Sequence, residues 1–241
     1  MSAKPKFHIR GLTPGPDDIR FMAEAYDSTL PHLAASGSGE QWGTTPFSER
    51  ADKDEKLKTF EQARQFQETG QGDRHIRIFI AEVEVEVEVP SSLHELPSSV
   101  RVRTDNNDND NNKKQFLAVG SVMISRGIFP SYMRLQFDRH PAVKEALLEG
   151  KDDYVYLEGL ITDFRTGPWR KGAGSALIAH CREYCRENGI KTIYLDGYSG
   201  NDRVLPKYYE SQGFTLVQDL EFHMPDDKIR TLAFLRIDVL E

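Results

Sequence analysis

Cysteine and long apolar runs are both scarce in this chain. Of its 241 residues only Cys181 and Cys185 are cysteines, four positions apart in a segment with helical periodicity. Side chains one helical turn apart rarely reach disulfide geometry, so we expect two reduced thiols in or beside the core. No stretch approaches the roughly 20 apolar residues of a membrane span, and the opening residues lack the apolar core of a signal peptide. These absences predict a cytoplasmic protein without a membrane partner, the nucleus being an alternative location.

Metal-ligand spacing and an excess of positive charge are also missing. The seven histidines contain no HExxH pattern, and two cysteines alone cannot build a structural zinc site, so no metal is expected. The formal net charge of -7 argues against a general nucleic-acid binder. Cationic or neutral partners are therefore favoured. Nothing in the sequence decides between a monomer and a homodimer.

The hydrophobic residues make up 38% of the chain and alternate between helical and strand periodicity. We expect one α+β domain over residues 1–241, with a mixed, mostly antiparallel sheet of six to seven strands and helices on both faces. Strands are predicted at 7–12, 76–89, 116–124, 154–162, 192–196, 214–222 and 232–239. Helices are predicted after Asp17, around 57–66, at 141–148, from Ser175 to Asn188 and at 203–211. Because strands 154–162 and 192–196 flank one helix, they should be parallel neighbours.

A long polar segment interrupts this pattern at residues 91–114. It follows the alternating run Glu82 to Val89, which predicts a strand with one apolar and one acidic face, and precedes its expected partner strand at 116–124. The Asp/Asn-rich run 104–112 lacks the glycine and glutamate spacing of a calcium-binding EF-hand loop. We therefore interpret 91–114 as a solvated loop insertion.

The most informative segment is the loop between strand 154–162 and the following helix. Gly172 and Gly174 remove side chains where a helix N-terminus begins, so backbone N–H groups can approach an anion. Arg165, Arg170 and Lys171 add positive charge, which suits a pyrophosphate. The mononucleotide P-loop would need Lys and Ser/Thr after its last glycine, and the dinucleotide fingerprint would need glycine at Leu177, so neither template fits.

A third template matches. The chain resembles the GNAT superfamily of N-acetyltransferases in three segments that occur in the family's order: Glu158 to Thr162, Arg170 to Ile178, and Asn201 through the Tyr-Glu-x-x-Gly-Phe run of Tyr209 to Phe214. The resemblance covers about residues 154–222. In one departure, Trp169 stands where the family usually has Arg or Gln, and Arg170 follows it. The resemblance implies acetyl-CoA as co-substrate.

The resemblance also implies where acetyl-CoA would bind. Its pyrophosphate would lie on the residues of the glycine loop and its thioester oxygen on a main-chain N–H of the preceding strand, while Asn201 would bind the pantetheine arm. These expected cofactor-binding residues are Leu160, Ile161, Thr162, Arg170, Lys171, Gly172, Ala173, Gly174, Ser175 and Asn201. The alternative interpretation is that Asn201 is only the N-cap of the following helix.

Acetyl transfer to an amine requires a group that removes the amine proton and one that protonates the departing thiolate. By resemblance, Glu158 is the expected general base and Tyr209 the general acid. Their alternatives are a strand glutamate paired with Arg or Lys and a buried aromatic anchor. Gln41 and Trp42 resemble an element that lines the acceptor site of many small-molecule members. Trp42 could otherwise simply anchor its loop.

The sequence therefore predicts an acetyl-CoA-dependent N-acetyltransferase that acts on the primary amine of a small molecule by direct transfer. Two alternatives stay open: an acetyltransferase for protein N-termini or lysines, and a non-catalytic acyl-CoA-binding module.

Overall fold

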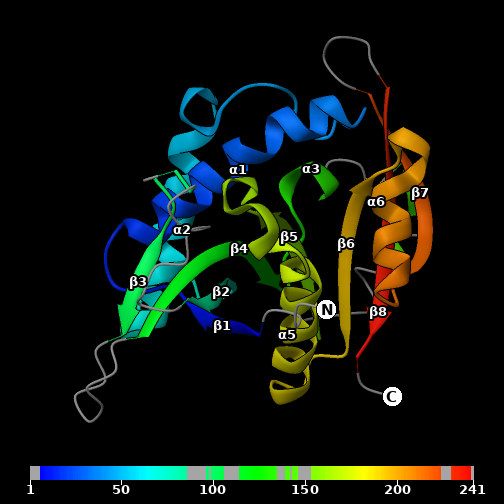
Figure 1. The fold of residues 1–241 in the computed structure, drawn as a ribbon. Coiled ribbons are helices and arrows are strands. Elements are labelled where there is room, and N and C mark those ends of the chain that lie inside the picture. Colours follow the sequence, from blue (N-terminus) through cyan, green and yellow to red (C-terminus); the bar gives the residue numbers. More distant parts are fainter. Residues whose placement is uncertain are drawn as a thin grey trace. The chain divides into compact units, whose positions relative to one another are not determined.

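The computed structural model describes residues 6–85, 96–97, 99–105, 114–134, 139–141, 143–145, 153–223 and 229–239. The chain forms two compact units. Figure 1 colours it by residue number, from blue at the N-terminus to red at the C-terminus. The first unit contains residues 1–30, 45–123 and 159–177, and the second contains residues 31–44, 124–158 and 178–241. Strands β4 (Lys114–Arg126) and β5 (Tyr154–Thr162) each contribute to both. That residues 1–241 act as a single domain stays a prediction.

The sheet of the first unit begins with two antiparallel strands. β1 (Phe7–Gly11) pairs with β2 (Ile76–Val85), and β2 is the neighbour of β4, as the alternating sequence predicts. The predicted acidic face of β2 is wrong at Glu82, which is completely buried. Its carboxylate forms ion pairs with Arg10 (2.6 Å) and Arg103 (2.9 Å), because a buried charge needs a partner. The last predicted residues of this strand, 86–89, lie outside the described residues.

A short strand lies within the segment that the sequence presents as a loop. β3 (Val102–Asp105) pairs antiparallel with the start of β4. Besides the Arg103 contact to Glu82, Arg101 lies 3.5 Å from the buried carboxylate of Asp18. The interpretation of 91–114 as a loop throughout is therefore wrong for 102–105. Arg101 and Arg103 alternate in the sequence and contact the buried acids Asp18 and Glu82, and this period-two pattern indicates a strand that the sequence analysis did not predict. Residues 106–112 of the Asp/Asn-rich run lie outside the described residues.

Helices accompany this sheet. α1 (Asp17–Ala35) begins with two acidic residues, which suit the positive end of a helix dipole. After the short 3-10 turn η1 (Phe47–Glu49), α2 (Lys53–Thr69) packs against β2. α2 ends at Gly70, whose φ of 72° and N–H bond to the Phe66 carbonyl form a left-handed cap.

The predicted strand–helix–strand arrangement is present, and the residues that pair its two strands belong to the second unit. β5 pairs in parallel with β6 (Thr192–Tyr198), β6 pairs antiparallel with β8 (Ile229–Asp238), and β8 pairs antiparallel with β7 (Thr215–His223). Helix α6 (Gly200–Ser211) packs against β6 and β8 (Figure 1). Between β5 and β6 come the 3-10 segment η2 (Phe164–Arg170) and α5 (Ala173–Glu187), in which both cysteines are buried free thiols.

An aromatic cluster fills one face of the second unit's strands. Phe129 is 1% exposed, and its ring centroid lies 4.8 Å from that of Tyr156. Tyr194 stacks on Phe234 at 5.3 Å. Met133, in the short helix α3 (Ser131–Arg134), belongs to the same cluster. Residues 154, 156 and 194 therefore face the same side, as period-two alternation on paired strands requires.

The predicted fold class is confirmed, since the described strands form a mixed, mostly antiparallel sheet accompanied by helices. The described residues contain eight strands where six to seven were expected, and β3 is the strand that was not predicted. The predicted helix at 141–148 falls partly outside the described residues. No helix in the described ranges is both long and apolar enough to cross a membrane.

Candidate active site

The glycine loop of the first unit joins η2 to α5. Gly172 has a φ of 95°, and a Cβ on it would lie 3.3 Å from the ring of Phe7. Ala173 and Gly174, which open α5, are buried, and the first N–H groups of a helix have no partner within the helix. The loop thus presents backbone donors with little side-chain bulk, which fits an anion.

Arg165, one of the three cations predicted for this loop, forms ion pairs with two carboxylates. The guanidinium of Arg165 contacts the buried carboxylate of Asp163 at 2.8 Å and the partly exposed carboxylate of Glu24 at 2.6 Å. The side chain of Asp163 also accepts the backbone N–H of Arg165, so the pair fixes the start of η2. The prediction that Arg165 supplies free positive charge is therefore wrong.

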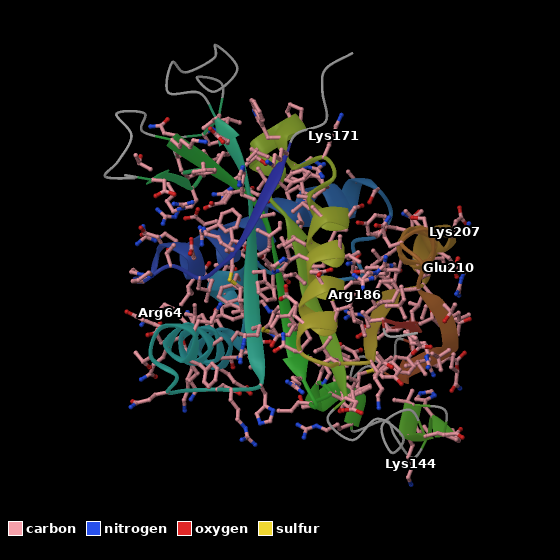
Figure 2. The ribbon with its side chains drawn as sticks, turned by 90° about the horizontal axis from the view of Figure 1, so that it is seen from below. Arg64, Lys144, Lys171, Arg186, Lys207 and Glu210 are labelled. Atoms are coloured by element: carbon pink, nitrogen blue, oxygen red, sulfur yellow. The ribbon has the colours of Figure 1, made fainter. Side chains whose placement is uncertain are left out.

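Arg170 is differently placed. Its guanidinium lies 3.5 Å from the centroid of the Phe164 ring and donates to Oγ1 of Thr162 at 3.3 Å. Burial lowers the pKa of Arg170, opposed only by the charge of Asp163. Among the residues that the structure describes, no carboxylate forms an ion pair with it. Lys171 is exposed at the N-terminal end of α5 (Figure 2). The loop therefore keeps two cations for an anionic ligand.

The end of β5 supplies the other predicted cofactor-binding residues. Gly159 has a φ of 57°, which interrupts the regular strand, and Leu160, Ile161 and Thr162 follow it. The parallel register with β6 covers Tyr154 to Tyr156 and goes no further in the described structure. The N–H groups of residues 160–162 thus lie beyond that ladder. Together with the loop, these residues fit the polyphosphate and thioester of an acyl-CoA.

Glu158 lies in the second unit, two residues beyond the last β5–β6 pair. Its Oε1 accepts a hydrogen bond from the Ser125 hydroxyl at 2.5 Å. The side chain is partly exposed. A carboxylate oriented by a hydroxyl and open to solvent can accept a proton.

Tyr209 is 6% exposed and lies on α6. Its ring meets Phe214 edge-on at 5.9 Å, and Gly197 leaves room for it, since a Cβ there would lie 3.3 Å from the ring. Burial raises the pKa of the Tyr209 hydroxyl, helped by the negative charge of Asp196. The hydroxyl therefore stays protonated and can serve as an acid. Its neighbours Lys207 and Glu210 point outward (Figure 2).

The start of α6 has an unusual backbone. Asn201, Asp202 and Arg203 have φ values of 53°, 52° and 59°, a region that residues other than glycine rarely enter. Asn201 is not the N-cap, which is Ser199. Its Nδ2 donates to the Ser36 carbonyl at 2.7 Å and to the Ser38 hydroxyl at 2.9 Å.

Gln41 and Trp42 belong to the loop that Asn201 contacts, residues 36–43, which we name the acceptor loop. Both are partly buried. Tyr198 on β6 gives this loop a second attachment by donating to Glu40 at 3.0 Å. The loop is thus fixed to β6 and to the start of α6.

Sequence reasoning missed a group centred on Asp196 of β6. Its Oδ1 accepts hydrogen bonds from the hydroxyls of Tyr132, at 2.6 Å, and of Tyr156. The sequence contained a signal for this group. Because strands 154–162 and 192–196 were expected to be parallel neighbours, their register places Asp196 opposite Glu158. Within the described ranges, no three His, Cys, Asp or Glu side chains gather to hold a metal ion.

Part of the chain matches a known protein family, and solved structures share its fold. Residues 131–214 match the model of the acetyltransferase (GNAT) family. The yncA protein of Salmonella typhimurium, solved with acetyl-CoA, is 14% identical, with a TM-score of 0.52 and coverage of 98% of this chain and 95% of that one. An N-acetyltransferase of Staphylococcus aureus has the same identity and TM-score, with 98% and 99% covered. A ribosomal-protein-alanine N-acetyltransferase of Brucella melitensis, also 14% identical, has a TM-score of 0.50, with 96% and 99% covered.

No curated protein matches the chain in sequence. The family match includes every predicted cofactor-binding and catalytic residue and excludes Gln41 and Trp42. It confirms the resemblance to GNAT acetyltransferases and, with it, the predicted enzyme class and acetyl-CoA as co-substrate. The solved structures share the fold and include a protein acetyltransferase, so the fold does not select the acceptor.

Proposed function

We propose that this GNAT-type acetyltransferase transfers the acetyl group of acetyl-CoA to the primary amine of a small molecule, by direct transfer. The observation that carries the proposal is the double attachment of the acceptor loop. Tyr198 bonds Glu40, and Asn201 bonds Ser36 and Ser38. A loop fixed in this way favours an enclosed acceptor site over the open groove that a peptide needs.

The phosphates would be held by residues of the first unit. Gly172 and Gly174 let the oxygens approach the N–H groups that open α5, and Arg170 and Lys171 supply positive charge. The residues 160–162 would donate a main-chain N–H to the thioester oxygen. Bound acetyl-CoA supplies the acetyl group as a thioester.

Proton transfers would be made by residues of the second unit. Glu158, oriented by Ser125, accepts a proton from the acceptor's ammonium group, so that the nitrogen gains a free electron pair and attacks the thioester carbon. As the carbon–sulfur bond breaks, Tyr209 donates its proton to the sulfur. The attacking nitrogen releases its second proton as the amide forms, and that proton restores the tyrosine hydroxyl. Asn201 has its Nδ2 on the acceptor loop, which leaves Oδ1 as the atom to accept an amide N–H of pantetheine.

The test compares acceptor classes. Purified protein is incubated with acetyl-CoA and either small primary amines or peptides bearing a free N-terminus or a lysine, while free CoA thiol is measured. We expect turnover with small amines and at least about tenfold lower kcat/KM with peptides. The reverse order would favour the protein acetyltransferase.

A further inference from the structure

Three carboxylates of this chain are buried and compensated by arginine, whereas a fourth, Asp196, is only partly buried and, within the described residues, is not compensated in this way. Asp18 is 1% exposed and meets Arg10 at 2.7 Å, Glu82 is met by Arg10 and Arg103, and Asp163 is met by Arg165. In each case an arginine compensates the negative charge. These carboxylates are structural, because their charge is satisfied within the fold.

Asp196 has no such compensation. In the parts of the chain that the structure describes, its side-chain partners are the neutral hydroxyls of Tyr132 and Tyr156, and no Lys or Arg forms an ion pair with it. Both tyrosines donate to the same oxygen, Oδ1, so Oδ2 takes part in neither bond. Burial raises the pKa of the Asp196 carboxyl, and the two tyrosine hydrogen bonds oppose that shift.

The position of Asp196 relates it to the proposed reaction. The last parallel pair is Tyr156 with Tyr194, and Glu158 and Asp196 each follow two residues later on the same face. Tyr132 connects them further, since its hydroxyl bonds Asp196 while the charge of Glu158 acts on it. Tyr209 also feels the charge of Asp196. The groups around Asp196 are thus three tyrosines and a second carboxylate.

Such surroundings suit a cation and repel an anion. Tyr132 is 43% exposed although its hydroxyl is bound, so its ring is accessible beside the carboxylate. Aromatic rings and a carboxylate together stabilise an alkylammonium group. An acceptor with its own carboxylate beside the amine would meet the charges of both Glu158 and Asp196.

We infer that Asp196, positioned by Tyr132 and Tyr156, binds the ammonium group of the acceptor and thereby restricts the enzyme to cationic amines that lack a carboxylate next to the amine. This inference rests on the proposed function and narrows its substrate class. Glu158 remains the proton acceptor. Asp196 contributes to binding, so its loss changes the affinity for cationic acceptors more than the rate of the bound complex.

Binding tests the inference without requiring turnover. Calorimetry with CoA present compares phenethylamine, its neutral analogue 2-phenylethanol, and phenylalanine, which adds a carboxylate. We expect the wild type to bind phenethylamine at least about tenfold more tightly than the other two, and Asp196→Asn to lose that preference. Asp238→Asn, an exposed carboxylate paired with Arg236 at the end of β8, is the matched control and should bind as wild type does.

Kinetics supply the second readout. For phenethylamine, Asp196→Asn should raise KM at least about tenfold and change kcat less than about threefold. In the wild type, KM should rise as the pH falls through the pKa of Asp196, because only the ionised form attracts the ammonium; Asp196→Asn should lack this rise. Tyr132→Phe is the second variant, to be used if Asp196→Asn fails to fold. It removes the hydrogen bond from the Tyr132 hydroxyl to Asp196 and should raise KM by a smaller factor.

Wild-type protein that binds phenethylamine no better than 2-phenylethanol overturns the inference, as does Asp196→Asn with unchanged affinity. Neither result depends on catalysis. If the amine binds as expected and no acetyl transfer occurs, the proposed function fails while the assignment of Asp196 stands.

Discussion

Ser125 on β4 donates a hydrogen bond to Oε1 of Glu158 on β5, with 2.5 Å between the two oxygens. The contact fixes a carboxylate at the point where the ladder between β5 and β6 has ended. Position and orientation thereby distinguish Glu158 from an ordinary strand glutamate. They make it the natural candidate to accept the amine proton.

Glu158→Gln should lower the rate most at neutral pH, with recovery toward pH 10, where more of the amine is already unprotonated. The measurement is kcat/KM against pH from about 6 to 10. Glu183→Gln, an exposed glutamate on α5, is the control and should match the wild type. A Glu158→Gln profile parallel to that of the wild type would remove Glu158 as the base.

Tyr209→Phe keeps the ring packing on Phe214 and removes only the hydroxyl. If that hydroxyl protonates the thiolate, kcat should fall about 10- to 1000-fold while acetyl-CoA affinity changes little. Because burial raises the pKa of Tyr209, the hydroxyl is protonated across pH 6 to 10, so the rising limb of the profile should persist at a lower plateau. Tyr208→Phe, on the same helix, tests whether any tyrosine loss has this effect.

Gly174→Val should weaken acetyl-CoA binding by about 2 kcal/mol, or roughly 30-fold, because a branched side chain blocks the approach of phosphate to the opening of α5. Calorimetry measures the affinity, and circular dichroism confirms folding. Ala179→Val places the same valine side chain at an exposed position of α5 and should leave the affinity unchanged. Unchanged affinity in folded Gly174→Val would remove the phosphate-loop assignment.

The two parts of the polar insertion should respond differently to mutation. Arg103→Ala leaves buried Glu82 with Arg10 as its remaining arginine and should destabilise the fold by about 2 kcal/mol, lowering Tm by about 4 to 8 °C. Replacing 106–113 by Asn-Gly, which suits a tight turn between residues 105 and 114, should lower Tm by less than about 3 °C. Thermal unfolding measures both. A larger fall in Tm from the loop replacement than from Arg103→Ala would contradict the assignment of 102–105 as structural and of 106–113 as a replaceable loop.

Much of the fold was predictable because its signals are local. The presence of a helix around 57–66, the limits of β5 and the glycine loop followed from periodicity and from the positions of glycine. The order of three motifs carried the family resemblance. What escaped prediction depends on contacts between distant residues. The alternating sequence predicts that Glu82 faces solvent, whereas the structure buries it between Arg10 and Arg103, which compensate its charge.

The same reason explains the errors at the site. Arg165 counts as a phosphate-binding cation in the sequence, and only the fold brings Glu24 to it. Asp196 could not be recognised as a site residue from the sequence, because the tyrosines that bind it, Tyr132 and Tyr156, lie 64 and 40 positions away. Asn201 has the spacing of a pantetheine-binding residue, whereas its contacts to Ser36 and Ser38 required the structure.

The most direct test of the proposed function measures both products of one reaction. Protein is incubated with acetyl-CoA and phenethylamine, and free CoA and N-acetylated amine are quantified together by mass spectrometry. Direct acetyl transfer predicts equal amounts of the two, formed only when enzyme and amine are both present. Tight acetyl-CoA binding with no amine-dependent release of CoA, for this amine or any other small primary amine, would contradict the account and favour a non-catalytic acyl-CoA-binding module.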